Sequence, residues 1–311
     1  MLINLKKIFN SKEEETQEVV IKPVTRIDHV DPKVGKYVAL TFDDGPCSKD
    51  FAGRGKGVTE CILDILKEYD VKATFNIIGS TSENRPDGQG EPGDVDWFGT
   101  KYDHFPCVGK DSLGGAVNHP EIVKRMIEEG HELSNHGYRH IPYGKLSGKL
   151  SKREFFRNSA DALDDLQRLH VFIEHRFGYK MRLAKAPHGA EYFEDGKTVD
   201  DVYKNMGYKY IGASYKADSM SSKESYQADV ESAVLPMAKI LETNPDAFCG
   251  KIIVFRDGCN ASMRTPILDS LPKQIELLKK YGYAFVTISD LLILRPKDSV
   301  ETALKDAGIE L

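Results

Sequence analysis

Residues 37–46 read YVALTFDDGP, and the interpretation of the rest of the chain starts from this stretch. Its first six residues are mostly apolar or β-branched, which predicts a buried strand. Asp43 and Asp44 follow at the strand's end, and Gly45 and Pro46 impose a turn directly after them. Because adjacent side chains at a strand end diverge, the two carboxylates can approach one site from different directions. One could bind a metal while the other accepts a proton; a solvated turn is the alternative.

Similar strand patterns recur along the chain and alternate with helix-like segments. Seven strands are expected, at 37–42, 73–78, 131–134, 182–186, 208–213, 251–255 and 283–288. The expected helices lie at 57–69, 119–129, 151–170, 197–206, 227–243 and 266–281. This alternation predicts an α/β fold with a parallel sheet, either open or closed into a barrel, whose functional groups gather at the carboxyl ends of the strands.

A second motif, NHGYRH, occupies residues 135–140 directly after the third expected strand. His136 and His140 stand at positions i and i+4, where side chains face the same way on one helical turn, a common spacing for metal ligands. Two imidazoles and one carboxylate leave coordination positions open for water and substrate, as hydrolytic zinc requires. Two surface histidines spaced by chance are the alternative, which is less attractive because both motifs end predicted strands.

Charge and hydropathy narrow the classes of partner. The chain has 311 residues, with 43 Lys and Arg against 48 Asp and Glu, and a formal net charge of −5. No basic tract stands out, so neither nucleic acid nor an anionic membrane is an expected partner. No apolar run approaches the roughly 18 residues of a membrane span. Lys6 and Lys7 interrupt the apolar start, so no clear signal peptide is recognised and the location is open, with the cytoplasm favoured.

One main domain with two tails is expected. Residues 1–35 form a polar N-terminal tail, 36–294 the α/β domain, and 295–311 a C-terminal tail or helix. The connection at 79–118 is rich in Gly, Asp and Pro and much longer than ordinary loops. Because it follows the second strand, it belongs to the functional end of the fold. Its tryptophan, Trp97, suits contact with a substrate; packing within the loop is the alternative.

Four segments together resemble the polysaccharide deacetylases of carbohydrate esterase family 4, the NodB-homology type. They read TFDDGP, ELSNHGYRH, AKAPHG and IIVFRDG, and the resemblance covers residues 36–294. It implies a distorted seven-stranded (β/α) barrel and a divalent metal, often zinc. It also implies a hydrolase that removes acetyl groups from N-acetylated sugars. The substrate would be a chitin-like or peptidoglycan-like polysaccharide or a small glycan.

Matched by position, the resemblance makes Asp43 the catalytic base. Asp44, His136 and His140 become the metal ligands. The family's third motif holds the base with an arginine two places before its proline, and Lys185 stands there in this chain. Lysine keeps the charge but loses the bidentate fork of arginine. A strand-end charge without a role in the site is the alternative for Lys185.

The loop after Lys185 also departs from the family pattern. His188 stands where the family usually has a tyrosine, whose backbone N–H helps to bind the oxyanion. Pro187 and Gly189 beside it are expected to contact the substrate. An ordinary loop histidine is the alternative for His188.

Arg256, in IIVFRDG, stands where the family has the histidine that protonates the leaving amine. Arginine does not release its proton at accessible pH, so it can stabilise an oxyanion but cannot serve as the acid. His188 is the predicted replacement because imidazole titrates near neutrality, with His104 and His119 as alternatives. Asp218 would then pair with Arg256; an ion pair of purely structural importance is the other interpretation.

The sequence therefore predicts a metal-dependent carbohydrate deacetylase acting on C–N bonds other than peptide bonds. A glycan-binding pseudoenzyme would keep the metal ligands and the groove but lack the acid. Arg256 favours this alternative and the intact Asp43 argues against it. A hydrolase of a non-sugar amide or cyclic ureide is a further alternative. The tryptophan of the family's fourth motif is not recognisable in IGASYKADS, residues 211–219, and its absence favours this alternative.

Overall fold

In a computed structural model of the chain, the described residues are 23–83, 96–97, 100–101, 112–147, 154–218, 221–260 and 262–296. The strands are β1 (Tyr37–Asp43), β2 (Thr74–Ile77), β3 (Asp96–Trp97), β4 (Thr100–Lys101), β5 (Glu132–Asn135), β6 (Leu183–Ala184), β7 (Lys209–Tyr210), β8 (Tyr215–Lys216), β9 (Ile252–Arg256) and β10 (Ala284–Phe285). The α-helices are α1 (Val58–Glu68), α2 (Pro120–Glu128), α3 (Ser159–Phe177), α4 (Val199–Met206), α5 (Tyr226–Thr243), α6 (Ile267–Lys280) and α7 (Ile288–Ile293).

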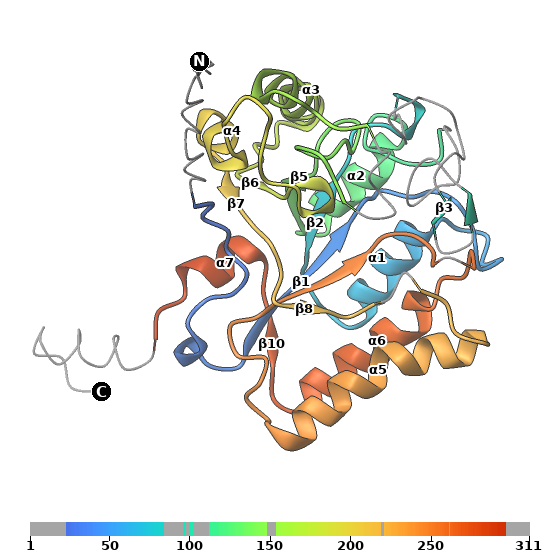
Figure 1. Cartoon of the computed structure of the whole chain (residues 1–311). Helices are drawn as coiled ribbons and strands as arrows, with labels where there is room; N and C mark the ends of the chain where they lie inside the picture. The colour runs from blue at the N-terminus through green and yellow to red at the C-terminus, as the bar shows by residue number, and fades with distance from the viewer. Residues whose placement is uncertain are drawn as a thin grey trace, which may run out of the picture.

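The main sheet is parallel and curled, with helices packed around it (Figure 1). Its strand order is β7-β6-β5-β2-β1-β9-β8, and β10 pairs with the first residues of β1. Every strand expected from the sequence is present, which confirms the α/β fold with a parallel sheet. The sequence did not predict β8, because its two residues, Tyr215 and Lys216, form no apolar run of their own.

The main core lies between one face of the sheet and the surrounding helices. Phe42 of β1 stacks on Phe75 of β2 at a ring-centroid distance of 5.1 Å, and on Phe255 of β9 at 5.3 Å. The three residues are register partners across the parallel strands, and their side chains are excluded from solvent. Stacked, fully buried aromatic rings therefore tie the three central strands together.

The other face of the sheet is apolar at the amino ends of the strands and polar at their carboxyl ends. Near the start of β1, Ala39 packs in a smaller apolar cluster with Ile288 and Leu291 of α7. Because side chains alternate along a strand, Asp43 lies on the same face as Ala39, four residues further along β1. The helix α7 thus covers the amino end of this face, and polar groups occupy its carboxyl end, where the sequence predicts the functional residues.

The helix expected at 151–170 is displaced in the structure. The described residues 154–158 are not helical, and α3 begins at Ser159, so the predicted start is wrong. The side chain of Asn158 accepts the backbone N–H of Asp161 and caps the helix, which is the local reason for the later start. The helix ends at Gly178, whose φ of 65° is left-handed.

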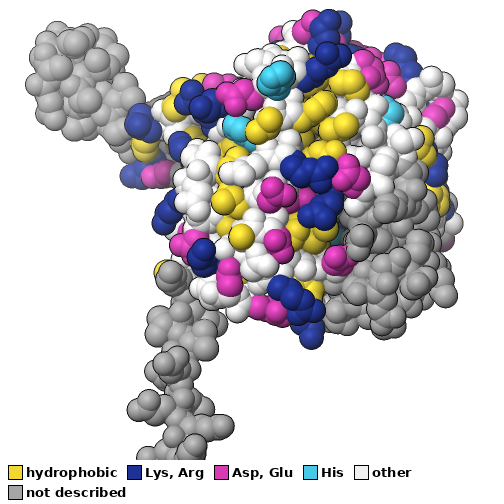
Figure 2. All heavy atoms as spheres, turned by 90° about the horizontal axis from the view of Figure 1, so that it is seen from above, with side chains coloured by type: hydrophobic (Ala, Val, Ile, Leu, Met, Phe, Trp, Pro, Cys, Tyr) yellow, Lys and Arg dark blue, Asp and Glu magenta, His cyan; other side chains and the backbone are white. Residues whose placement is uncertain are grey.

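The segment 23–35 runs along the sheet, where Ile27 forms a parallel bridge with Ile211. Residues 1–22 and 297–311 lie outside the described part of the chain, so the predicted tails stay predictions. Among the described residues, no helix has the length and apolar character needed to cross a membrane. Figure 2 shows acidic and basic side chains intermixed over the face seen from above.

Candidate metal centre and active site

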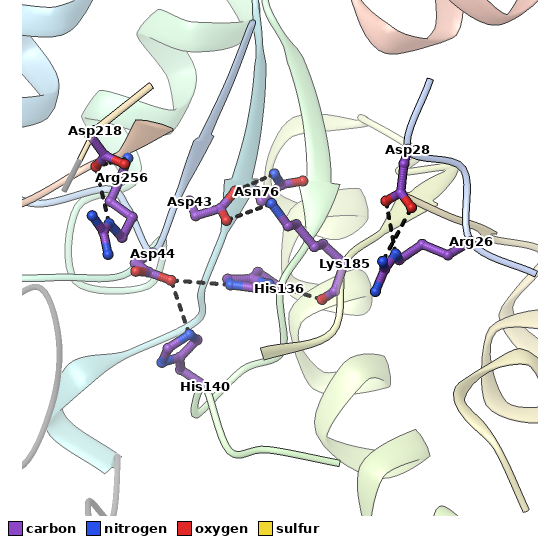
Figure 3. Close-up of polar contacts among 10 residues, drawn as sticks. All are labelled: Arg26, Asp28, Asp43, Asp44, Asn76, His136, His140, Lys185, Asp218 and Arg256. Carbon is purple, nitrogen blue, oxygen red and sulfur yellow. Dashed lines mark hydrogen bonds and ion pairs between the residues drawn. The ribbon is translucent and has the colours of Figure 1, made fainter. Parts of the chain in front are cut away.

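Three side chains converge just beyond the carboxyl ends of β1 and β5 (Figure 3). Asp44 Oδ1 lies 3.1 Å from His136 Nε2 and 3.0 Å from His140 Nε2. One possible ligand atom from each residue lies within 4.8 Å of the other two, and all three residues are buried. The structure therefore brings together the three residues that the sequence assigns to the metal; their role as ligands stays a prediction.

The tautomer of His136 follows from its second contact. Its Nδ1 lies 2.9 Å from the carbonyl oxygen of Lys185. Since a carbonyl can only accept, Nδ1 donates to it, and Nε2 is the ring nitrogen that faces Asp44. Metal-ligating histidines are commonly oriented in this way, with the other ring nitrogen held by a carbonyl or carboxylate. One carboxylate and two imidazoles form a donor set that fits zinc or a similar divalent ion.

The chemistry of Asp44 also suits a ligand. Burial disfavours its charged form, but the nearby His140 and His136 outweigh that effect and hold the pKa of Asp44 well below its usual range. The backbone of Asp44 has a left-handed φ of 75°. At the next residue, a Cβ on Gly45 would lie 2.1 Å from Asp257 Oδ2, so a side chain cannot be accommodated there.

The i, i+4 histidine pair does not lie on a helical turn, and in this respect the sequence interpretation is wrong. Residues 136–140 are not helical. Left-handed φ values of 82° at Gly137 and 55° at His140 shape an irregular turn instead. The rings of His136 and His140 nevertheless lie 4.9 Å apart between centroids. The convergence of the two imidazoles therefore depends on whatever holds this turn in place.

Asp43 lies beside the three converging residues but has partners of its own. Its Oδ2 accepts a hydrogen bond from Lys185 Nζ at 2.7 Å, and its Oδ1 accepts one from Asn76 Nδ2 at 2.6 Å. The predicted ion pair between Lys185 and Asp43 is thus observed. Asn76 was missed, although a polar residue inside the apolar run ATFNII was a usable signal. It is the register partner of Asp43 on β2 and is fully buried.

Arg256 is the register partner of Asp43 on the other side, on β9. Its Nε and its backbone N–H both donate to Asp218 Oδ2, at 3.1 Å and 3.0 Å. The expected ion pair with Asp218 is therefore present, and both residues line a small pocket together with Cys259 and Asn260. The guanidinium held here places a positive charge at the carboxyl end of β9, beside Asp43.

His188 is an exposed residue that lies beside His140, one of the three converging residues. It sits in a 3-10 turn, Pro187–Gly189, and its ring centroid is 4.9 Å from that of His140. Pro187 is buried, whereas His188 and Gly189 are exposed. The turn that the sequence assigns to substrate and oxyanion binding therefore adjoins the three converging residues.

Asp257, the residue after Arg256, is a buried acid. Its Oδ2 accepts a hydrogen bond from Thr59 Oγ1 at 2.6 Å, and its Oδ1 has no partner among the described residues. Burial raises the pKa of Asp257 to about 8 against the effect of the Thr59 hydrogen bond, with the charge of Asp44 adding to the rise. The carboxyl group is therefore largely protonated at neutral pH.

Part of the predicted site lies outside the described residues. Trp97 is a residue of β3, which pairs antiparallel with β4. Only the backbone of Trp97 is described. His104 and most of the 79–118 connection lie outside the described residues as well. His119 is described, and its Nε2 contacts the carbonyl oxygen of Ser112 at 2.8 Å.

Residues 31–211 match the family described as polysaccharide deacetylase. The chain belongs to the polysaccharide deacetylase family. Among its family relatives, a peptidoglycan-N-acetylglucosamine deacetylase of Bacillus cereus is 28% identical, over 84% of this chain and 90% of the relative. The peptidoglycan-N-acetylmuramic acid deacetylase PdaC of Bacillus subtilis is 25% identical, over 90% of this chain but only 43% of the relative.

Solved structures of polysaccharide deacetylases share the fold. The chitin deacetylase of Colletotrichum lindemuthianum aligns with a TM-score of 0.57 and 23% identity, covering 89% of this chain and 95% of that one. A carbohydrate esterase family 4 pseudoenzyme of Bacillus anthracis aligns with a TM-score of 0.53 and 19% identity, covering 86% and 69%. These similarities confirm the predicted NodB-type (β/α) barrel.

Proposed function

We propose that this polysaccharide deacetylase family member is an active, zinc-dependent deacetylase of N-acetylated glycans. The observation that carries the proposal is that two adjacent residues at the carboxyl end of β1, Asp43 and Asp44, have separate sets of partners. Asp44, His136 and His140 form one buried group, whereas Asp43 stands beside them with Lys185 and Asn76 as its partners. Hydrolysis of an acetamide needs both a metal site with open positions and a separate base.

Asp44 Oδ1 and the Nε2 atoms of His136 and His140 would hold the zinc. When bound, the ion would polarise the acetyl carbonyl and lower the pKa of water. Asp43 would accept the proton of the attacking water. Its hydrogen bonds from Lys185 and Asn76 orient the carboxylate.

The turn at Pro187–Gly189 would serve the developing products. A backbone N–H near His188 would stabilise the oxyanion, and the His188 imidazole would protonate the leaving amine nitrogen. The proximity of the His188 and His140 rings, 4.9 Å between centroids, supports this assignment. Arg256 would contribute positive charge near the oxyanion rather than a proton.

The proposed substrate is a glycan that contains N-acetylglucosamine or N-acetylmuramic acid, the sugars in the names of the two relatives. The 79–118 connection would form one wall of the groove, with Trp97 stacking on a sugar ring. Pro187 and Gly189 would line the opposite side.

Metal analysis and acetate release from the same purified preparation test the proposal. We expect about one equivalent of zinc and release of acetate from short chitin oligomers or from peptidoglycan fragments. Removal of the metal with a chelator should abolish release, and added zinc should restore it. A protein that releases acetate equally well without any metal would contradict the mechanism.

Arg256 favours a second candidate, a glycan-binding protein without turnover, because its guanidinium occupies the place of the family's acid. The variant Arg256→His separates the two. If the wild type releases no acetate from any acetylated glycan while Arg256→His does, the pseudoenzyme interpretation is correct. If the wild type is active and His188→Ala is strongly impaired, the deacetylase interpretation stands.

A further inference from the structure

One carboxylate outside the site holds the turn between the two histidines. Asp165, on α3, accepts the backbone N–H of Tyr138 at 2.7 Å through Oδ2, with a longer contact to the N–H of Arg139 at 3.4 Å. Its Oδ1 accepts Arg139 Nε at 2.8 Å. All of these contacts fall on residues that lie between His136 and His140.

The same turn is held from its opposite side by the end of β2. The backbone N–H groups of Gly79 and Ser80 both donate to the carbonyl oxygen of Tyr138, each at 2.9 Å. Asp165 therefore binds the N–H side of this short segment, while the residues after β2 bind its C=O side. In a helix the intrahelical hydrogen bonds would fix the positions of residues i and i+4, but these residues are not helical. Contacts from other elements hold the turn instead.

Burial makes this carboxylate more than a surface contact. Asp165 is 0% exposed. A buried carboxylate is costly unless it is paired and hydrogen-bonded, and Arg139 together with the backbone N–H groups meets that need. Gly137 permits the close approach, because a Cβ there would lie 3.2 Å from Asp165 Oδ2 and 3.4 Å from the Tyr143 hydroxyl. Glycine also adopts the left-handed φ of 82° at this position without strain.

We propose that Asp165 is a positioning residue for the metal ligands. It fixes the irregular turn so that the Nε2 atoms of His136 and His140 both face Asp44. The proposal rests on the metal site of the proposed function, but it assigns a role to a residue on α3 that is not one of the three converging residues.

Binding of Co²⁺ to metal-free protein tests this role, because Co²⁺ bound by nitrogen and oxygen ligands gives visible absorption bands that depend on ligand geometry. Asp165→Asn keeps the side-chain shape but replaces an acceptor with an NH₂ donor, so at least one hydrogen bond is lost. We expect about 10- to 100-fold weaker Co²⁺ binding, the usual range for groups that orient ligands, together with altered absorption bands. Asp164→Asn, the exposed neighbour on the same helix, is the matched control and should bind as the wild type does.

Circular dichroism of each metal-free variant establishes whether it is folded. If Asp165→Asn does not fold, Co²⁺ binding to Gly137→Ala tests the proposal instead. The alanine keeps the carboxylate but pushes the turn away from it, so a smaller loss of affinity is expected. Wild-type affinity and bands in both folded variants would show that Asp165 only stabilises the fold, and the proposed function would survive. A wild type that binds no Co²⁺ would overturn the proposed function and this inference together.

Discussion

The proposed metal ligands, at the ends of β1 and β5, follow the family pattern, whereas the residues at β6 and β9, which flank these strands from opposite directions, depart from it. Asp44 and His136 are buried, with side chains 8% and 3% exposed. Lys185 and Arg256, which replace the family's arginine and histidine, are 14% and 24% exposed. Both sets have specific partners, so the difference between them is one of enclosure: Asp44 and His136 are shielded from solvent more completely than Lys185 and Arg256.

Lys185 shows why one set can vary without disturbing the other. Its side chain holds Asp43, while its backbone carbonyl orients the ring of His136. Because every residue type provides the carbonyl, a substitution at this position can leave the His136 contact intact and alter only the contact with Asp43. The proposed metal ligands and the proposed proton-transfer groups are thus separable, and the following experiments test that separation.

The largest effect is expected from the proposed metal ligands. Asp44→Ala removes the only carboxylate of the three-residue group, so the zinc content of the purified protein should fall to near zero and acetate release to background. Elemental analysis and the acetate assay measure both, with Asp164→Ala as an exposed control. Retention of zinc in Asp44→Ala would show that the ion binds elsewhere.

Asp43→Asn should separate the base from the ligands. The amide cannot accept the proton of water, so kcat should fall by about 10²- to 10⁴-fold, the usual contribution of a general base. Zinc content should match the wild type, since Asp43 is not one of the three converging residues. If zinc is lost instead, the two aspartates have exchanged the roles proposed for them.

His188→Ala tests one of the positions that depart from the family pattern. Loss of the proposed proton donor should lower kcat by about 10²-fold, the low end of the range for an acid or base, because an exposed site lets water replace part of its role. KM and zinc content should change little. His175→Ala, an exposed histidine on α3, is the control. An unchanged kcat in His188→Ala would assign the acid to another group.

The smallest effect on turnover is expected from Asp257→Asn. The effect of this variant is measured instead as a change in folding stability with pH. The pKa of Asp257 is raised from 3.8 to about 8, so between these values the folded state keeps a proton that the unfolded state has lost. This contribution to folding stability therefore decreases as pH rises through that window, by up to about 1.4 kcal/mol per pH unit. Asparagine cannot ionise and removes the effect.

Thermal unfolding of the metal-free proteins checks this expectation. The Tm of the wild type should fall relative to that of Asp257→Asn between pH 5 and pH 8, by a few degrees overall. Parallel Tm curves for the two proteins across this range would mean that Asp257 is already ionised at the lower pH.

The sequence by itself determined the fold class and the location of the site. Both follow from local patterns: apolar runs such as 37–42 form strands, the strands alternate with helices, and parallel topology gathers their carboxyl ends. It also indicated that Lys185 would pair with Asp43, although only through the family resemblance. Local patterns gave too early a start for α3, because the Asn158 cap outweighed the preceding helix-like residues.

Only the tertiary structure decided which groups hold the functional residues in place. Asn76 and Asp43 are 33 residues apart in the chain, and Asp165 and Tyr138 are 27 apart. Neither contact has a periodic signature, since each depends on how two elements pack. The irregular turn of His136–His140 depends on the same packing, because backbone groups outside regular structure find their hydrogen bonds wherever the fold supplies partners.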